Sequence, residues 1–361
     1  MNSAVVTFAT TIVVGLSLVL VAIWSRPSAR PHAIAPRGTA RRREIRAAAS
    51  ILQLPGQVPH RRGGARRAAR AKHQLGRSRG VTCWATVEDS IVLLGPPRSG
   101  KGLHLCIPLI LEAPGSVLTT STRPDNLTAT LRARSRRGPV AVFDPQGLAP
   151  GIPSATRWSP IRGCEEPHTA MVRARALTSN SAAGTTDASF WQASAEQAVR
   201  CLLHAAALGD CTTGDLYRWS LTAVHAREAV TILICDERAA PGWHQALDAI
   251  VTADPRQRDA VWSMVTIALS ALADPRVLDA VSPGPGEDFD PEEFLRRSGT
   301  IYLLGTSTGA AATAGLIGAF VEDVVEAAKR IAARSPAPDW TRRSPCCWTR
   351  PPTTRFLRCR R

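Results

Sequence analysis

Lysine is scarce in this chain of 361 residues, because only Lys72, Lys101 and Lys329 occur among 45 basic residues. Arginine in place of lysine, together with abundant alanine, is typical of GC-rich bacterial coding sequences and indicates no particular function. Cys-x-x-Cys pairs are also lacking among the nine cysteines, which disfavours a zinc site and a small disulfide-stapled scaffold. A folded body in a reducing cytosol is the simplest interpretation.

Acidic residues are nearly lacking from two segments of a chain whose net charge is +16. Residues 26–80 hold 15 basic residues and one acidic residue, and residues 340–361 hold seven basic and no acidic residues. These segments together carry +21, so the rest of the chain carries −5, which argues against a cationic nucleic-acid groove in the body. With 44% hydrophobic and 20% charged residues, the chain is neither disordered throughout nor a fibrous repeat.

Residues 4–24 form an uncharged run of 21 residues, close to the ~20 that a membrane-spanning helix needs. Positive charges follow this run, which disfavours a cleaved signal peptide and predicts a cytoplasmic body. We therefore expect a single-pass anchor in the cell membrane over residues 1–25. Residues 26–80 are typical of a basic juxtamembrane linker whose arginines attract anionic lipid headgroups, with DNA contact as the less favoured alternative.

The body predicts a parallel α/β sheet interrupted by helices. Short apolar runs typical of strands are separated by segments that can be helical, and helical spacing dominates further along the chain. The predicted strands are residues 81–86, 90–94, 117–120, 140–143 and 300–304. The predicted helices are residues 190–208, 221–233, 243–251, 258–272 and 316–332.

A phosphate-binding loop is predicted where the second of these strands ends. Residues 95–102 read Gly-Pro-Pro-Arg-Ser-Gly-Lys-Gly, which fits G-x-x-x-x-G-K between a strand and a helix. Backbone N–H groups and the Lys101 ammonium would bind the phosphates of ATP. Gly102 stands where Ser or Thr usually offers a hydroxyl to Mg²⁺, so the metal needs water or another side chain there. The predicted nucleotide-binding residues are Gly95, Pro96, Pro97, Arg98, Ser99, Gly100, Lys101, Gly102 and Leu103.

The fold class that follows is a P-loop NTPase with a parallel sheet and an all-α insertion, preceded by one transmembrane helix. Its predicted parts are a first core segment over 81–187, the all-α domain over 188–295, a core continuation over 296–338 and an aberrant basic tail over 339–361.

Such a loop needs a carboxylate partner to hold Mg²⁺ and polarise water. The literal match is Asp236-Glu237 after four apolar residues, but it lies amid helical spacing and precedes a Pro-Gly exit, so we interpret it as part of a helix. Asp144, at the end of the predicted strand 140–143, is another candidate for a place near the nucleotide. No catalytic residue and no dedicated metal ligand are predicted.

Together these motifs resemble the conjugative coupling proteins of type IV secretion, the TraG/TraD class, especially their actinobacterial members. The loop 95–102 followed by Leu-His-Leu-Cys-Ile-Pro is similar to that family's loop, in which glycine after the lysine is common. Residues 114–126 resemble its next strand and polar turn, and residues 299–305 resemble the strand before its Asp-Glu motif. The resemblance covers roughly residues 81–332.

This resemblance implies a membrane-anchored ATPase, hexameric when active. Such a protein receives a relaxase-bound DNA strand or a protein substrate and delivers it to the components of a secretion channel. ATP and Mg²⁺ are the implied cofactors. The family usually has a pair of membrane spans, whereas this sequence predicts one.

The tail after residue 338 does not resemble the family, because a hydrophobic strand ending in Asp-Glu is expected there. Reading the third base of each codon with the first two of the next makes Cys346-Cys347-Trp348-Thr349 encode Leu-Leu-Asp, whatever the codons used. With GC-rich codons and AGG for Arg350, the alternate frame continues as Glu-Ala-Ala. We therefore expect a frameshift shortly before Asp339, which would leave the chain defective in hydrolysis; a natural basic tail that binds nucleic acid is the alternative.

Two other functions stay open. One is a non-catalytic membrane-bound adaptor that recruits substrate without ATP turnover. The other is a DNA-translocating ATPase of the chromosome-segregation type, which the long helical insertion disfavours.

Overall fold

The computed structural model describes residues 41–49, 72–86, 89–94, 96, 98–152, 156–179, 188–305 and 311–334. The chain divides into two compact units, the first with residues 1–54 and 76–83 and the second with residues 55–75 and 84–361. The predicted anchor, residues 4–24, and the tail, residues 339–361, lie outside the described residues. No helix in the described ranges is long and apolar enough to cross a membrane.

The first described elements are a short helix and two strands. Helix α2 spans Arg42–Ala49, strand β1 Lys72–Ser78 and strand β2 Val81–Thr86, and β1 and β2 form a two-stranded sheet. Arg79 and Gly80 connect the strands with φ values of 48° and 77°, the left-handed pair of a tight hairpin turn. The strand predicted over residues 81–86 is thus confirmed, whereas β1 arises inside the predicted linker.

A three-stranded parallel sheet organises the second unit. Its strands are β3 Val117–Ser121, β4 Val140–Phe143 and β5 Thr300–Leu304, in the order β3-β5-β4. All five residues of β5 are buried, as expected for a central parallel strand covered on both faces. Helix α5, Asp125–Arg134, connects β3 to β4, and the long excursion from β4 to β5 contains most of the helices.

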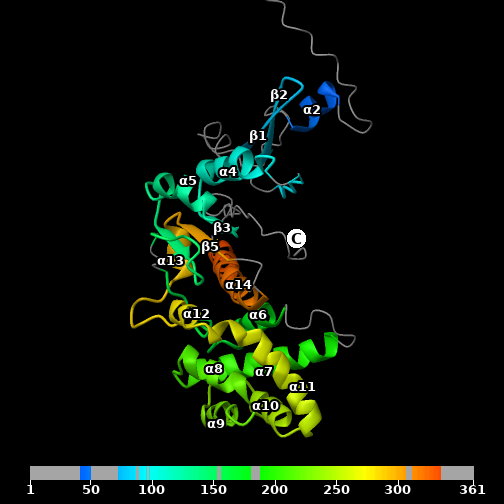
Figure 1. Ribbon diagram of the computed structural model, residues 1–361, viewed down its shortest axis with the longest axis vertical. Coiled ribbons are helices and arrows are strands. Elements are labelled where there is room, and N and C mark those ends of the chain that lie inside the picture. The colour runs from blue at the N-terminus through cyan, green and yellow to red at the C-terminus, as the bar shows by residue number, and fades with distance from the viewer. Residues whose placement is uncertain are drawn as a thin grey trace, which may run out of the picture. The chain divides into compact units, whose positions relative to one another are not determined.

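The helices between β4 and β5 form the largest part of the second unit, with α7 buried among them (Figure 1). The predicted helices 190–208 and 243–251 are confirmed as α7 and α10. The single helix predicted over residues 221–233 is wrong, because Thr222 is extended and divides the segment into α8 and α9. The predicted helix 258–272 is α11 followed by a 3₁₀ turn. The bounds are α6 Pro167–Thr178, α7 Ala188–Leu208, α8 Thr213–Leu221, α9 Arg227–Cys235, α10 Trp243–Val251, α11 Pro255–Leu269, η2 Ser270–Ala273, α12 Pro275–Ala280 and α13 Pro291–Arg296.

Helix α14, Ala311–Ala333, follows β5, packs against α6 and confirms the predicted helix over residues 316–332. Buried Arg173 on α6 forms an ion pair with Asp323 on α14 at 3.0 Å. The Trp158 indole N–H donates to the same carboxylate at 2.9 Å, and the Arg173 guanidinium lies 4.9 Å from the Trp158 ring. These contacts fix α14 against α6 in the core.

A second buried arginine joins the ends of the sheet strands. Arg134, at the end of α5, donates through Nε to Thr300 Oγ1 at 2.7 Å, and through its two Nη groups to the carbonyls of Ala113 and Gly115 at 2.9 and 2.7 Å. Arg134 is 1% exposed, so its guanidinium exchanges water for these three protein acceptors. The amino ends of β3 and β5 are held together by this side chain.

The strand predicted over residues 90–94 is wrong. This segment is irregular, and Ile91, Val92, Leu93 and Leu94 are 41%, 66%, 43% and 89% exposed. A parallel strand forms only when a neighbour completes its hydrogen bonds, and the three strands of the described sheet do not include one beside this segment. Residues 90–94 thus have the composition of a strand, but none of the described strands pairs with them.

Candidate phosphate-binding site

The predicted phosphate loop ends at the start of a helix, as the motif requires. Lys101 begins a helical stretch in which the π-helix η1, Gly102–Cys106, runs into α4, Ile107–Glu112. The Lys101 ammonium donates to the carbonyl of Pro96 at 2.7 Å and to Ser99 Oγ at 3.4 Å. Gly95 and Pro97 lie outside the described residues. The Lys101 side chain therefore lies across the loop. A phosphate bound there could replace the Pro96 carbonyl as the acceptor of its ammonium group.

Gly100 is required by both conformation and space. Its φ of +79° lies in the left-handed region, and a Cβ there would lie 2.6 Å from Cδ2 of His104. The His104 amide donates to the Gly100 carbonyl at 2.8 Å, so the helix closes its first turn directly over the loop. The sequence motif does not predict the contact between His104 and Gly100. The contact arises because the first turn of the helix brings the His104 ring back over the loop.

Gly102 has room for a side chain, in contrast to Gly100. A Cβ at this position meets nothing within 4 Å, and its φ lies outside the left-handed region. The space around residue 102 would therefore accept the Ser or Thr that usually stands there, and packing does not explain why this chain has glycine. The next predicted residue, Leu103, points its side chain largely to solvent, with 65% exposed.

The two carboxylate candidates have structural partners in the described residues. Both Asp144 oxygens accept backbone N–H groups, from Leu148 at 2.9 Å and Ala149 at 2.8 Å, which folds the turn after β4. These bonds give Asp144 a structural role in that turn, and its place near the nucleotide stays a prediction.

The Asp236-Glu237 pair is not at the end of a strand. Helix α9 ends just before it, which confirms the interpretation of this segment as helical. Asp236 accepts two hydrogen bonds from the Arg238 side chain, at 3.0 and 2.7 Å, and this pairing lowers the Asp236 pKa to about 2. The Asp236 carboxylate is thus bound by Arg238, two residues later in the same turn.

No group of three or more His, Cys, Asp or Glu side chains suited to a metal occurs in the parts of the chain that the structure describes.

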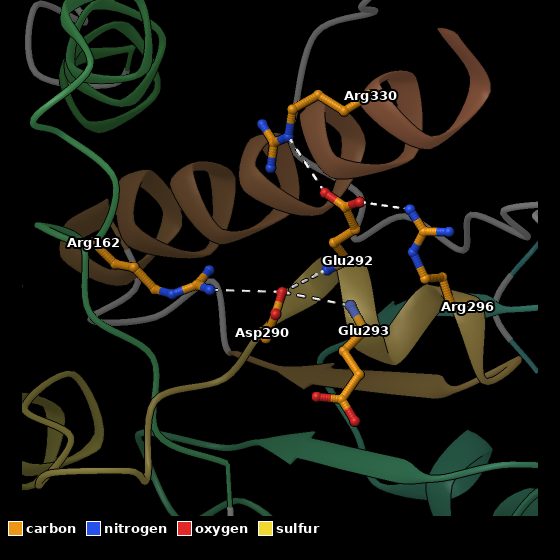
Figure 2. A pocket seen from close by; sticks show the side chains of 6 residues that line it. All are labelled: Arg162, Asp290, Glu292, Glu293, Arg296 and Arg330. Carbon is orange, nitrogen blue, oxygen red and sulfur yellow. Dashed lines mark hydrogen bonds and ion pairs between the residues drawn. The ribbon is translucent and has the colours of Figure 1, made fainter. Parts of the chain in front are cut away.

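A separate charged pocket of about 360 Å³ lies between α13 and α14, and the sequence motifs do not predict it. Figure 2 shows Glu292 between Arg296 and Arg330, with ion-pair distances of 2.7 and 3.9 Å. Asp290 caps α13 and lies 3.5 Å from Arg162. Hydrogen bonding from Arg296 lowers the pKa of Glu292. The acidic and basic side chains that line the pocket pair with one another. These ion pairs hold α13 against α14, and we do not interpret the pocket as a ligand site.

Residues 47–336 match the family described as type IV secretory system conjugative DNA transfer. The chain belongs to this family. The resemblance to this family is thereby confirmed, over more of the chain than residues 81–332.

Solved structures of one coupling protein are similar to the chain at low identity. The bacterial conjugative coupling protein TrwB, in an unbound monoclinic form, is 16% identical with a TM-score of 0.43, covering 64% of this chain and 49% of TrwB. TrwB in complex with ADP and Mg²⁺ is 14% identical with a TM-score of 0.35, covering 60% of this chain and 53% of TrwB. The chain thus spans about half the length of these structures. No curated protein matches the chain.

Proposed function

We propose that this member of the conjugative DNA-transfer family is the nucleotide-binding part of a coupling ATPase that delivers DNA or protein to a type IV secretion channel. The observation that carries the proposal is the family match over residues 47–336 together with the loop closed by Lys101. The α/β sheet with its helical excursion is the scaffold that such a loop needs.

ATP with Mg²⁺ is the proposed ligand. TrwB structures contain ADP with Mg²⁺, and an ATP analogue. In this chain, Lys101 and the N–H groups around Gly100 would bind the phosphates, and a bound Mg²⁺ would supply further charge neutralisation. Because Gly102 offers no hydroxyl, the metal would depend on water or on groups beyond the described residues.

Membrane anchoring is the second part of the proposal. The uncharged residues 4–24 and the basic linker that follows support a single span with the body in the cytoplasm. The partners would then be the membrane, the components of the secretion channel, and a relaxase-bound DNA strand or a protein substrate. A protein with the complete core would act as a hexamer.

A frameshift before Asp339 is the third part. The family match ends at residue 336. In the segment that follows, the alternate frame encodes Leu-Leu-Asp whatever the codons used, and it continues as Glu-Ala-Ala with GC-rich codons and AGG for Arg350. The chain as written would then lack the carboxylates of the missing motif and hydrolyse ATP poorly. The sequence of the loop and its flanks separately supports a coupling protein of the actinobacterial type.

Replacing Lys101 by Ala tests the nucleotide-binding proposal. The change removes the point charge at the phosphates, so affinity for a fluorescent ATP analogue, measured by titration, should fall at least tenfold. Lys329→Ala is the matched control, because Lys329 lies on α14, is 62% exposed and forms an ion pair with Glu326 on the same helix at 2.6 Å. Equal affinity of the Lys101→Ala variant and the unaltered chain would contradict the proposal.

A non-catalytic adaptor is the second candidate, favoured by the exposed residues 91–94 beside the loop and by the structural use of Asp144 and Asp236. Recruitment of the substrate complex by the Lys101→Ala variant, at the level of the unaltered chain, would support the adaptor over the ATPase.

A further inference from the structure

His104 differs from a structural histidine of the same fold. In the helical region, buried His204 has a partner for each ring nitrogen, because Nδ1 lies 2.8 Å from the Cys164 carbonyl oxygen and Nε2 accepts the Ala240 amide at 3.0 Å. The His104 side chain is exposed, and neither of its ring nitrogens has a hydrogen-bond partner among the described residues. No hydrogen bond in that part of the chain therefore accounts for an imidazole at position 104.

The His104 ring lies against the phosphate loop. A Cβ on Gly100 would lie 2.6 Å from Cδ2 and 3.1 Å from Nε2 of this ring, so the edge that carries Nε2 faces the glycine. The backbone supports this arrangement, because the His104 amide donates to the Gly100 carbonyl at 2.8 Å. The Lys101 ammonium donates across the same loop to the Pro96 carbonyl at 2.7 Å. A second side chain that can donate an N–H, besides Lys101, thus lies at the loop.

The backbone of the loop has the conformation of an anion-binding turn. Arg98 and Gly100 have φ values of 60° and 79°, both in the left-handed region, and one residue separates them. Left-handed residues in a turn direct neighbouring N–H groups to one side, where they form a concavity that binds anions. Since the His104 ring contacts Gly100, a phosphate bound by these amides would lie within reach of Nε2.

The groups around His104 leave its ring available to a phosphate. Helices α4 and α5 pack against η1. The charged side chains on the loop and on these two helices are Arg98, Lys101, Glu112, Asp125, Arg132 and Arg134. Within the described residues, no ion pair joins His104 to either carboxylate. Burial raises the pKa of Cys106 on η1, so its thiol stays neutral at the pH values used below.

We propose that His104 is a second phosphate-binding side chain of this loop, which donates from Nε2 to a phosphate oxygen of the bound nucleotide. The proposal rests on the proposed nucleotide binding and adds to it a residue that the motif does not contain. A protonated imidazole donates a charge-assisted hydrogen bond, which is stronger than that of the neutral ring. Imidazole groups change their charge between pH 5 and 8, so the contribution of His104 to affinity should increase as the pH falls through this range.

Titration of the full chain with a fluorescent ATP analogue at pH 6 and pH 8 tests this proposal. His104→Phe keeps a flat ring against Gly100 but removes the N–H donor, and should lower the affinity about tenfold at pH 6 and about twofold at pH 8. His104→Gln retains a neutral donor, and should match the unaltered chain at pH 8 and bind more weakly at pH 6. The phosphates of the analogue titrate alike with every variant, so the affinities are compared as the ratio of variant to unaltered chain at each pH.

His168→Phe is the matched control, because His168 is an exposed histidine on α6, outside the loop. Its affinity should stay within about twofold of the unaltered chain at both pH values. An equal loss for His104→Phe at both pH values would show that the ring only packs against the loop, and no loss would show that it does not reach the ligand. Either result would overturn the proposal while nucleotide binding stands.

Competition with inorganic pyrophosphate identifies the part of the nucleotide that His104 contacts. Pyrophosphate should displace the analogue from the unaltered chain, and its own affinity should fall about tenfold in His104→Phe at pH 6. If the substitution weakens binding of the analogue but not of pyrophosphate, His104 contacts the base or the ribose and the assignment to phosphate is wrong. Failure of the unaltered chain to bind the analogue at either pH would contradict the proposed function, and this proposal with it.

Discussion

Gly100 is the residue at which the loop is most sensitive to substitution. Gly100→Ala places a Cβ 2.6 Å from the His104 ring on a backbone with φ of +79°, so the loop must change shape. Nucleotide affinity should fall at least tenfold in a titration with the fluorescent ATP analogue.

Gly102→Ala is the control for this prediction, because its Cβ meets nothing within 4 Å. Its affinity should stay within about twofold of the unaltered chain, and helix propensity should raise stability by up to about 1 kcal/mol. Equal affinities for the two variants would contradict the role of Gly100.

Cysteine reactivity should follow burial. Burial raises the pKa of Cys164 to about 12 and that of Cys201 to about 11, so neither forms the reactive thiolate at pH 8 in the folded protein. Cys235 is exposed. Brief iodoacetamide treatment at pH 8, followed by peptide mass spectrometry, should label Cys235 and leave Cys164 unlabelled until urea unfolds the chain. Fast labelling of Cys164 would show that the core around Pro160 and Arg173 opens readily.

At the scale of elements, the ion pair between α6 and α14 should contribute strongly to stability. Asp323→Asn leaves Arg173 charged, 2% exposed and without its carboxylate partner, and should lower the free energy of unfolding by about 3–5 kcal/mol in urea denaturation. Glu326→Gln, on the same helix, removes only the exposed pair with Lys329 and should cost less than about 1 kcal/mol. A loss below about 1 kcal/mol for Asp323→Asn would contradict this account.

The elements that the sequence predicts correctly are those specified by local pattern. Residues 117–120, 140–143 and 300–304 are short apolar runs with their own strand neighbours, and α7, α10 and α14 have sustained helical spacing. The run 221–233 continues the apolar spacing through Thr222, whose extended backbone no periodicity reveals. Residues 90–94 have the pattern of a strand, but none of the described strands pairs with them, and a local pattern does not show whether such a neighbour exists.

The candidate site was predictable in part, for a related reason. The motif identifies Gly100 and Lys101 because their spacing is fixed by the phosphate, whereas the contact of His104 with the loop depends on the path of the helix. The role of Asp144 depends on a turn four residues later. Sequence position places it at a strand end but does not show that Leu148 and Ala149 occupy its oxygens.

At the scale of the whole molecule, three observations stand together: family membership over residues 47–336, an exposed apolar run before the phosphate loop, and a tail that encodes Leu-Leu-Asp in another frame. The proposed frameshift gives the third observation a simple explanation, because the strand that the family resemblance leads us to expect would then be encoded in the alternate frame. The membrane anchor proposed for residues 4–24 is independent of this point and would be tested by fractionating the chain with and without those residues.

The most direct measurement is the nucleotide sequence across the codons for residues 333–361, read from the source DNA by an independent method. The account predicts one base missing or extra before the codon for Asp339, and an open frame that continues through Leu-Leu-Asp-Glu-Ala-Ala. A confirmed frame as written, with stop codons soon after in the alternate frame, would contradict it.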